Sequence, residues 1–382
     1  MLKWGWFKIK TSNFVGILLF TIFVSFLIGI LVGGFEYPPY STIKSLYLEI
    51  IPQKIEIDNF DDLEIDVSSL IHIQNYDDIL NSRIFLINYI WGYDTLPNDI
   101  LPDKIEQNIS DERFSDLTNF KQIDKITILM DYGINSEAYL FLPSISNNKL
   151  VIYHQGHGGD VVLGKNTIQY FLDNNYSVLA FSMPLIEPNN QPTVNLENFG
   201  NLILNSHDDL KFLESEDFSP IKFFVEPITI SLNYMDKKYN FESYDMVGIS
   251  GGGWTTVLYS ALDTRISKSY PVAGSTPMYL RINDDKNLGD YEQTVPKLYS
   301  NVGYLDLYIM ASYGDNRGQL QIFNKYDPCC FSGFGFKTYE SEIKNLILKL
   351  EKGNFDIFLD EINKKHDISD RSLDVILNDM KY

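Results

Sequence analysis

The sequence predicts an α/β fold in which a mostly parallel sheet has helices on both faces, preceded by one transmembrane helix. Three observations support this prediction. Short apolar runs alternate with helical patterns after about residue 120, a glycine-rich turn joins one such run to a helix, and a long uncharged segment lies near the N-terminus. Alternating strands and helices are typical of parallel sheets, because each crossover helix covers a face of the sheet. A chain of 382 residues allows one large domain with an extension.

The uncharged segment comprises the 25 residues from Thr11 to Phe35, between Lys10 and Glu36. As a helix it would be about 37 Å long, enough to cross a hydrocarbon core of about 30 Å. Three lysines precede it and acidic residues dominate after it, so the positive-inside tendency predicts a cytoplasmic N-terminus and an exported domain. The alternative is a cleaved signal peptide, although no small-x-small cleavage site occurs near residues 33–34. We therefore expect residues 1–35 to form a cytoplasmic tip and an uncleaved membrane anchor.

Charge and cysteine content narrow the possible functions. The formal net charge is −20; without the three lysines of the first 35 residues, 28 basic and 51 acidic side chains leave −23. Such a surface repels phosphate backbones, so we expect no nucleic-acid partner and a preference for neutral or cationic substrates. The two cysteines, Cys329 and Cys330, are adjacent and cannot join distant parts of the fold. They could form a disulfide with each other, remain buried thiols or line a pocket.

The chain after the anchor divides into an extension, residues 36–120, and a main domain, residues 121–382. We expect the extension to pack on the main domain, and its apolar stretch Ser82–Trp91 fits either a helix or a buried strand. A segment rich in Asn, Asp and Pro at about 184–240 could be a cap over a pocket or a simple surface excursion. In the main domain the patterns predict strands at 126–130, 138–142, 150–153, 177–181, 244–249, 266–272, 305–311 and 355–359, and helices at 166–173, 252–262, 340–351 and 369–380.

The sequence Gly248-Ile249-Ser250-Gly251-Gly252 lies between a predicted strand and a predicted helix. Glycines at 248 and 252 remove Cβ atoms that would clash as the strand reverses into the helix, and the serine is exposed at the turn. The N–H of Gly251 would face a developing oxyanion, and the helix N-terminus adds positive potential. A phosphate-binding nest is the alternative, but no lysine lies between Gly248 and Arg265. Ser250 is therefore the candidate nucleophile.

A second glycine-rich turn, His154-Gln155-Gly156-His157-Gly158, ends the predicted strand at 150–153, about 90 residues before the serine. With these two turns the chain resembles the α/β-hydrolase superfamily, in its esterase and lipase branches, over about residues 120–382. The resemblance implies the α/β-hydrolase fold, and it implies that the N–H of His157 is the second oxyanion donor, with Gly158 close behind. The histidine usual in this motif is displaced to position 154. Alternatively, His154, His157 and Asp160 could bind zinc, but no further ligand is placed to complete that site.

Members of this superfamily carry their triad in the order serine, acid, histidine. Of the five histidines, only His366 follows Ser250, and it lies after the last predicted strand. The acid should follow the penultimate strand. Asp315 lies just past the predicted strand at 305–311 and is the first candidate; Asp327 is the alternative.

These residues predict acyl transfer to water by a serine hydrolase that needs neither cofactor nor metal. His366 would remove the Ser250 proton, and Gly251 and His157 would hold the oxyanion. The resemblance implies carboxylic esters, of small molecules or of polymers, as substrates. Serine peptidases and acyltransferases use the same constellation. A metal-dependent hydrolase and a non-catalytic surface protein that binds a ligand or partner are the alternatives from other classes. The oligomeric state does not follow from the sequence.

Overall fold

The computed structural model describes residues 65–197, 199–281 and 288–381, together with 21 and 23–25. The chain divides into two units, residues 1–56 and 57–382, and the fold described below belongs to the second. Within the described residues, no helix has the length and apolarity that a membrane crossing requires. Apart from residues 21 and 23–25, the span predicted for residues 11–35 lies outside the described part of the chain.

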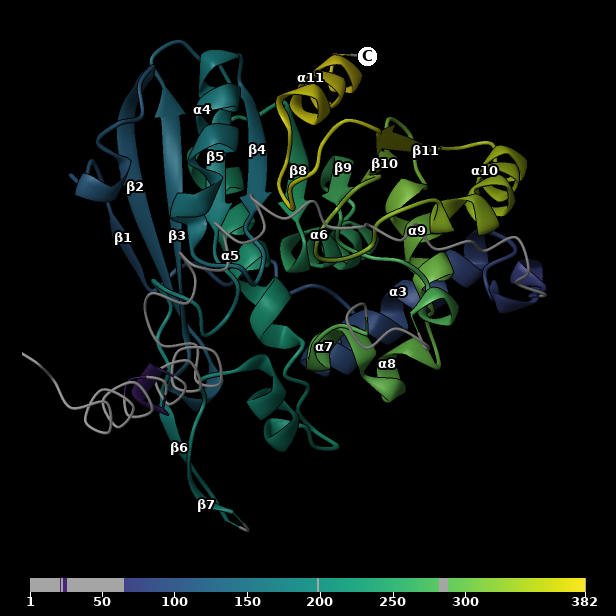
Figure 1. Ribbon diagram of the computed structural model, residues 1–382, viewed down its shortest axis with the longest axis horizontal. Coiled ribbons are helices and arrows are strands. Elements are labelled where there is room, and N and C mark those ends of the chain that lie inside the picture. The colour runs from purple at the N-terminus through teal and green to yellow at the C-terminus, as the bar shows by residue number, and fades with distance from the viewer. Residues whose placement is uncertain (1–20, 22, 26–64, 198, 282–287, 382) are drawn as a thin grey trace, which may run out of the picture. The chain divides into compact units, whose positions relative to one another are not determined.

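A nine-stranded sheet with the order β1-β2-β3-β5-β4-β8-β9-β10-β11 forms the centre of this unit (Figure 1). Antiparallel pairings join β1 to β2, β2 to β3 and β3 to β5. The remaining pairings, which join β5, β4, β8, β9, β10 and β11 in that order, are all parallel. The prediction of a mostly parallel α/β sheet is thereby confirmed. The strands are β1 (Lys104–Glu106), β2 (Phe120–Leu129), β3 (Asn135–Pro143), β4 (Lys149–His154), β5 (Ser177–Phe181), β8 (Ser243–Ile249), β9 (Ile266–Val272), β10 (Gly318–Asn324) and β11 (Asn354–Asp360).

Helices cover both faces of the sheet, because successive strand residues point to opposite faces. In β4, Leu150 and Ile152 belong to one hydrophobic core, and Val151 and Tyr153 belong to the other. The second core contains the apolar sides of α4 (Lys165–Asp173) and α11 (Asp370–Asp379). The first core contains those of α3 (Tyr76–Trp91), α5 (Lys222–Lys238), α6 (Gly251–Leu262), α9 (Tyr304–Ser312) and α10 (Glu340–Lys349). Strand residues buried on both faces explain why β4 and β5 appear in the sequence as continuous apolar runs.

The described part of the extension packs on the main domain. The apolar stretch that fitted helix or strand is the helix α3, whose N-terminus is capped by Asn75. Arg83 Nε donates to the carbonyl oxygen of Ala261 at 2.9 Å, and Trp91 Nε1 donates to Glu226 Oε2 at 2.8 Å. The extension also adds β1 to the edge of the sheet.

Two irregular segments leave the sheet from the carboxyl ends of parallel strands. Residues 182–221 follow β5 and contain a hairpin that extends away from the sheet (Figure 1), formed by β6 (Thr193–Leu196) and β7 (Gly200–Ile203), and the 3-10 helix η5 (His207–Leu213). The predicted insertion is therefore shorter than 184–240, because its last part is the buried crossover helix α5. Residues 273–303 follow β9 and contain the short helices α7 (Tyr291–Thr294) and α8 (Pro296–Tyr299).

The strand predicted at residues 305–311 is wrong. These residues lie in the helix α9, and the penultimate strand is β10, which was not predicted. Every residue of α9 is buried, so its sequence shows no polar face that would give a helical period. Gly303 is the N-cap of this helix, and its N–H donates to Asp306 Oδ2 at 3.0 Å. An acid that follows the penultimate strand must therefore come after Asn324, the last residue of β10, and not after residue 311.

Candidate active site

Ser250 lies in a strained turn between β8 and α6. Its backbone has φ 57° and ψ −126°, a left-handed conformation that is uncommon for residues other than glycine. A Cβ atom at Gly248 would lie 2.1 Å from the carbonyl oxygen of Gly252, and one at Gly252 would lie 2.1 Å from that of His154. Only glycine fits at both positions, as the sequence predicts. Ser250 N donates to the carbonyl oxygen of Val272 at 2.9 Å, which fixes the turn against β9.

The loop after β4 packs against this turn. A Cβ atom at Gly156 would lie 2.6 Å from Ser250 Cβ and 3.3 Å from Gly251 N. The ring of His157 lies against Gly251, where a Cβ atom would be 2.3 Å from its Cε1. The structure therefore brings Ser250, Gly251 and His157 together, and Gly158 lines the same pocket as Ser250.

His366 is held by Asp327. Nδ1 of His366 lies 3.0 Å from Oδ1 and 2.9 Å from Oδ2 of the carboxylate, whose side chain is fully buried. His366 lies between β11 and α11 and Asp327 just after β10, so both occupy the carboxyl edge of the sheet. The buried Nε2 of His366 has no hydrogen-bond partner among the described residues. This atom is the ring nitrogen that does not contact Asp327.

Asp315, the first candidate for the acid, does not contact His366. Its side chain is 75% exposed, and its Oδ2 accepts a hydrogen bond from Lys352 Nζ at 2.8 Å. Asp315 precedes β10 and so lies at the amino edge of the sheet, whereas Asp327 follows β10 at the carboxyl edge. The alternative candidate, Asp327, therefore replaces Asp315. The error follows directly from the helix α9, which the sequence suggested was the strand.

Cys329 and Cys330 form a disulfide with each other, one of the three arrangements that the sequence allowed. Their backbone N–H groups donate to Oδ1 of Asp327 at 2.9 and 3.3 Å. The sulfur atoms and a ring nitrogen of His366 lie within 4.8 Å of one another. Cys329 and Cys330 thus belong to the turn whose N–H groups hold the carboxylate of Asp327 next to Nδ1 of His366.

Ser250 and His366 line one pocket of about 320 Å³. Its wall combines backbone from both glycine-rich turns with polar and apolar side chains from three parts of the chain. The other lining residues are Tyr153, Gln155, Gly156, Gly158, Leu163, Gly164, Asn166, Thr167, Ile249, Asp367 and Ile368. The pocket is large enough for a small organic group next to the serine.

The zinc alternative built on His154, His157 and Asp160 is not assembled. His154 is buried, its Nδ1 lies 2.9 Å from the carbonyl oxygen of Gln155, and burial lowers its pKa to about 4. Asp160 caps the following turn by accepting a hydrogen bond from Val162 N at 3.1 Å. His157 instead meets three residues that the sequence analysis did not single out.

These three residues are His207, Asp290 and Glu292. Nε2 of His157 lies 3.1 Å from Nδ1 of His207, 3.1 Å from Oδ2 of Asp290 and 2.9 Å from Oε1 of Glu292. Burial alone would lower the pKa of His207, but attraction to Glu292 outweighs it, so that the pKa is raised. Burial would also raise the pKa of Glu292, but attraction to His207 outweighs it and holds that pKa far below its usual range. No sequence spacing links His157, His207 and the pair Asp290 and Glu292, because these come from three segments far apart in the chain.

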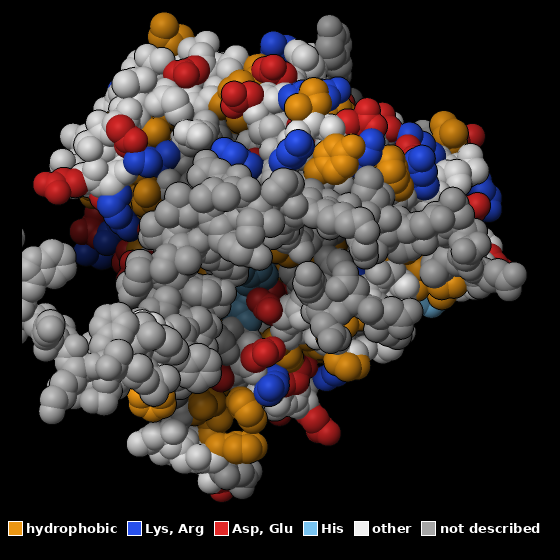
Figure 2. Space-filling view, viewed as in Figure 1, with side chains coloured by type: hydrophobic (Ala, Val, Ile, Leu, Met, Phe, Trp, Pro, Cys, Tyr) orange, Lys and Arg blue, Asp and Glu red, His pale blue; other side chains and the backbone are white. Residues whose placement is uncertain are grey.

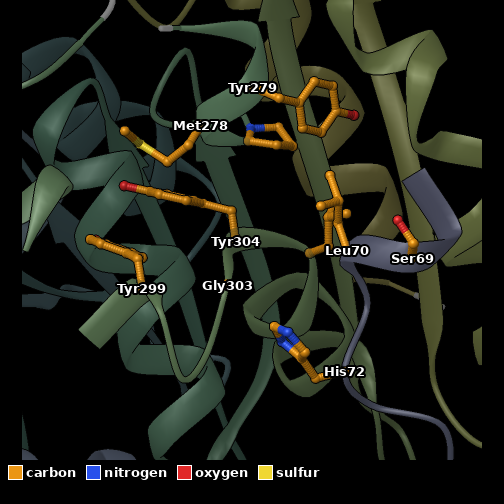
Figure 3. Close-up of a pocket in the computed structure, with 10 residues that line it drawn as sticks. Ser69, Leu70, His72, Met278, Tyr279, Tyr299, Gly303 and Tyr304 are labelled. Carbon is orange, nitrogen blue, oxygen red and sulfur yellow. The ribbon is translucent and has the colours of Figure 1, made fainter. Parts of the chain in front are cut away.

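A second pocket, of about 240 Å³, is lined by aromatic rings and does not include Ser250. Figure 3 shows Tyr299 and Tyr304 on one side of it and Ser69 and Leu70 of the extension on the other. His72 closes one end, with its Nδ1 2.8 Å from Oδ2 of Asp306. The extension therefore helps to shape this pocket.

Solved esterases have similar structures. An acetyl xylan esterase from a Thermoanaerobacterium species matches with a TM-score of 0.52 and 14% identity, over 83% of this chain and 98% of its own. An acetyl xylan esterase from a Paenibacillus species has a TM-score of 0.49 at 12% identity, with the same coverage of 83% and 98%. An esterase from Pyrococcus furiosus has a TM-score of 0.48 at 13% identity, over 74% of this chain and 97% of its own.

No protein-family model matches the chain, and no curated protein matches its sequence. The similarity to the Thermoanaerobacterium structure, the strand order of the sheet and the turn at Ser250 together identify the fold. The protein has the α/β-hydrolase fold and shares it with esterases.

Proposed function

We propose that the protein is a serine hydrolase that cleaves carboxylic esters, with Ser250 as nucleophile, His366 as general base and Asp327 as the acid that orients it. One observation carries the proposal. His366 is held on one ring edge by both oxygens of Asp327, its other nitrogen has no hydrogen-bond partner among the described residues, and it shares a pocket with Ser250. An imidazole that is oriented on one side by a carboxylate and has its other nitrogen unpartnered in the pocket of the serine supports a role as the general base for that serine.

In the proposed reaction, Nε2 of His366 takes the proton of Ser250 Oγ as the oxygen attacks the ester carbonyl. The N–H groups of Gly251 and His157 stabilise the resulting oxyanion, with the positive end of α6 adding to the potential. His366 then protonates the leaving alcohol, which leaves an acyl-enzyme. Water, deprotonated by His366, attacks the acyl group and releases the acid, and the proton returns to Ser250.

Asp327 accepts the Nδ1–H of His366 in this scheme, so that the lone pair of Nε2 is the one available to the serine. The N–H groups of Cys329 and Cys330 stabilise the negative charge of the carboxylate. The acid is thus oriented by the backbone of its own turn.

Neutral or cationic esters are the proposed substrates, because the domain carries an excess of acidic side chains. The similar Thermoanaerobacterium structure is an acetyl xylan esterase. Acetyl esters, first p-nitrophenyl acetate and then acetylated xylan, are accordingly the substrates to test first.

The test combines labelling with turnover. The wild-type protein should react with a serine-directed fluorophosphonate at Ser250 and should hydrolyse p-nitrophenyl acetate. Ser250→Ala should abolish both activities, whereas Ser115→Ala, a change at an exposed serine that follows the 3-10 helix η2 (Glu112–Phe114), should preserve them. Labelling of a different serine, or undiminished turnover by Ser250→Ala, would exclude the proposed nucleophile.

We further propose that residues 1–35 anchor this domain to a membrane with the N-terminus in the cytoplasm. The proposal rests on the uncharged 25-residue segment and the three lysines before it. Protease added to intact cells should digest the domain and spare the first ten residues. Protection of the domain would reverse the orientation, and its release into the medium would indicate a cleaved signal peptide.

A further inference from the structure

His157, His207, Asp290 and Glu292 bring their nitrogen and oxygen atoms together beside the nucleophile turn. One atom from each side chain can be chosen so that all four lie within 4.8 Å of one another. The residues come from three separate segments: the loop after β4, the 3-10 helix η5, and the start of α7. Figure 2 shows histidine and acidic side chains next to one another in a hollow near the centre of the face that is turned to the viewer. Such convergence of distant segments on one point needs a physical reason.

Hydrogen bonds alone do not satisfy this cluster. Nε2 of His207 lies 2.9 Å from the carbonyl oxygen of Pro184, which can only accept, so Nε2 carries a proton. In a neutral ring, Nδ1 of His207 then has a lone pair, and it faces Nε2 of His157 at 3.1 Å. If both rings were instead cationic, two N–H groups would point at each other across that distance.

The carboxylates show the same shortage of protons. Glu292 is fully buried, yet its Oε2 has no hydrogen-bond partner among the described residues, although it lies 3.3 Å from Nδ1 of His207. Nε2 of His157 has one hydrogen at most, but Asp290 and Glu292 each place an oxygen within 3.1 Å of it. A buried carboxylate oxygen without a donor is costly. One cation between the four side chains would satisfy all of these atoms.

The donor set selects the kind of cation. Imidazole nitrogen favours transition metals over Ca²⁺ and Mg²⁺, and two nitrogens with two carboxylate oxygens suit Zn²⁺. Bonds of about 2.0–2.1 Å in a tetrahedron place neighbouring ligand atoms about 3.3 Å apart. Nε2 of His157 lies 2.9 to 3.1 Å from Nδ1 of His207, Oδ2 of Asp290 and Oε1 of Glu292, and Nδ1 of His207 lies 3.3 Å from the other Glu292 oxygen, Oε2, and 3.9 Å from Oδ2 of Asp290. The carbonyl of Pro184 fixes the tautomer of His207, which is the usual outer contact of a metal-binding histidine.

We propose that His157, His207, Asp290 and Glu292 bind one Zn²⁺ ion in a structural site. Four protein ligands complete a tetrahedral shell and leave no position for a reacting water. The ion fastens η5 and the start of α7 to the loop that contains His157. Because the ring of His157 packs against Gly251, the site also holds the two glycine-rich turns together. The binding of zinc does not depend on the proposed ester hydrolysis.

The experiment measures metal binding by the full-length protein in detergent, after treatment with a chelator and dialysis. Titration with ZnCl₂ in a calorimeter should give one ion per chain, with release of protons from the histidines. The midpoint of thermal unfolding should rise by several degrees in excess Zn²⁺. Co²⁺ in place of Zn²⁺ should give the intense visible absorption of a tetrahedral ion, a result that needs no variant.

Variants assign the ligands. Glu292→Gln and His207→Gln should each weaken Zn²⁺ binding by more than about tenfold. The matched controls, Glu226→Gln at another buried glutamate and His72→Gln at a histidine of the extension, should bind one ion as the wild type does. The proposal is overturned if the wild type binds no stoichiometric Zn²⁺, if its Co²⁺ form shows only weak octahedral bands, or if both ligand variants bind as tightly as the controls. If the wild type binds no stoichiometric Zn²⁺, the four side chains form an ion-pair cluster only.

Discussion

Both carboxylate oxygens of Asp327 lie within 3.0 Å of Nδ1 of His366, although 39 residues separate the two in the chain. Parallel strands make this contact possible, because β10 and β11 are neighbours and both end at the same edge of the sheet. Asp327 follows the first strand and His366 follows the second. The carboxyl end of β8 brings Ser250 to the same edge.

The choice of acid can be tested by comparing Asp327→Asn with Asp315→Asn. Asp327→Asn should lower kcat for p-nitrophenyl acetate by about 10⁴-fold with little change in KM, because the wrong tautomer of His366 is then favoured. Asp315→Asn removes only an exposed ion pair with Lys352 and should leave kcat within about twofold. Equal effects of the two changes on kcat would contradict the assignment of Asp327.

The close approach of the two glycine-rich turns predicts the effect of added methyl groups. In Gly252→Ala the new Cβ would lie 2.1 Å from the backbone oxygen of His154, which cannot move without displacing β4. We expect a loss of about 3 kcal/mol, the upper end of what overpacking costs, in the free energy of unfolding. Gly158→Ala is the matched control, because its Cβ would have no atom within 4 Å. Urea denaturation of the two variants measures the difference; similar stabilities would mean that the turns are farther apart than described.

Asp245 predicts a dependence of stability on pH. Its side chain is buried in β8, and burial raises its pKa to about 7, although Lys268 N donates to Oδ1 at 3.1 Å. The folded protein therefore keeps a proton on Asp245 between the unfolded pKa of 3.8 and about 7, while the unfolded chain does not. Because the folded state binds more protons in that window, this group makes stability fall as the pH rises through it.

Asp245→Asn should remove that penalty. At pH 8 its free energy of unfolding should exceed that of the wild type by up to roughly 4 kcal/mol, and at pH 4 the two should be nearly equal. Asp99→Asn, at an exposed position, should show no such difference. Urea denaturation at both pH values gives the comparison. If the variant is less stable than the wild type at pH 8, burial of the ionised Asp245 carboxylate does not destabilise the folded protein.

The disulfide between Cys329 and Cys330 should support the position of Asp327. Reduction frees the turn whose two N–H groups donate to Oδ1, so kcat of the wild type should fall by at least about tenfold in reductant. The double variant Cys329→Ser, Cys330→Ser should have the same kcat with and without reductant. If reductant leaves the kcat of the wild type unchanged, the disulfide is not needed to orient Asp327.

The elements that sequence patterns identified correctly are those with a local signal. The hairpin of β2 and β3, the strand β9 and the turn at Ser250 have an alternation or a glycine pattern within a few residues, and β5 is a short apolar run of strand length. The helix α9 has no such signal. Its residues are apolar throughout because the helix is buried on every side, and a buried helix and a buried strand have the same appearance in sequence.

The sequence alone was enough to predict Ser250, the two glycine-rich turns and His366 as parts of the candidate site. Each depends on covalent neighbours: steric limits require glycine beside Ser250, and His366 is the only histidine after it. The acid and the four-residue cluster became visible only in the folded chain. In the sequence Asp315 and Asp327 both look like turn residues. They differ in their place relative to β10, since Asp315 precedes this strand at the amino edge of the sheet and Asp327 follows it at the carboxyl edge. Likewise, His157, His207 and Glu292 meet because strand order and crossover helices bring three loops to one edge, a relationship that no local spacing records.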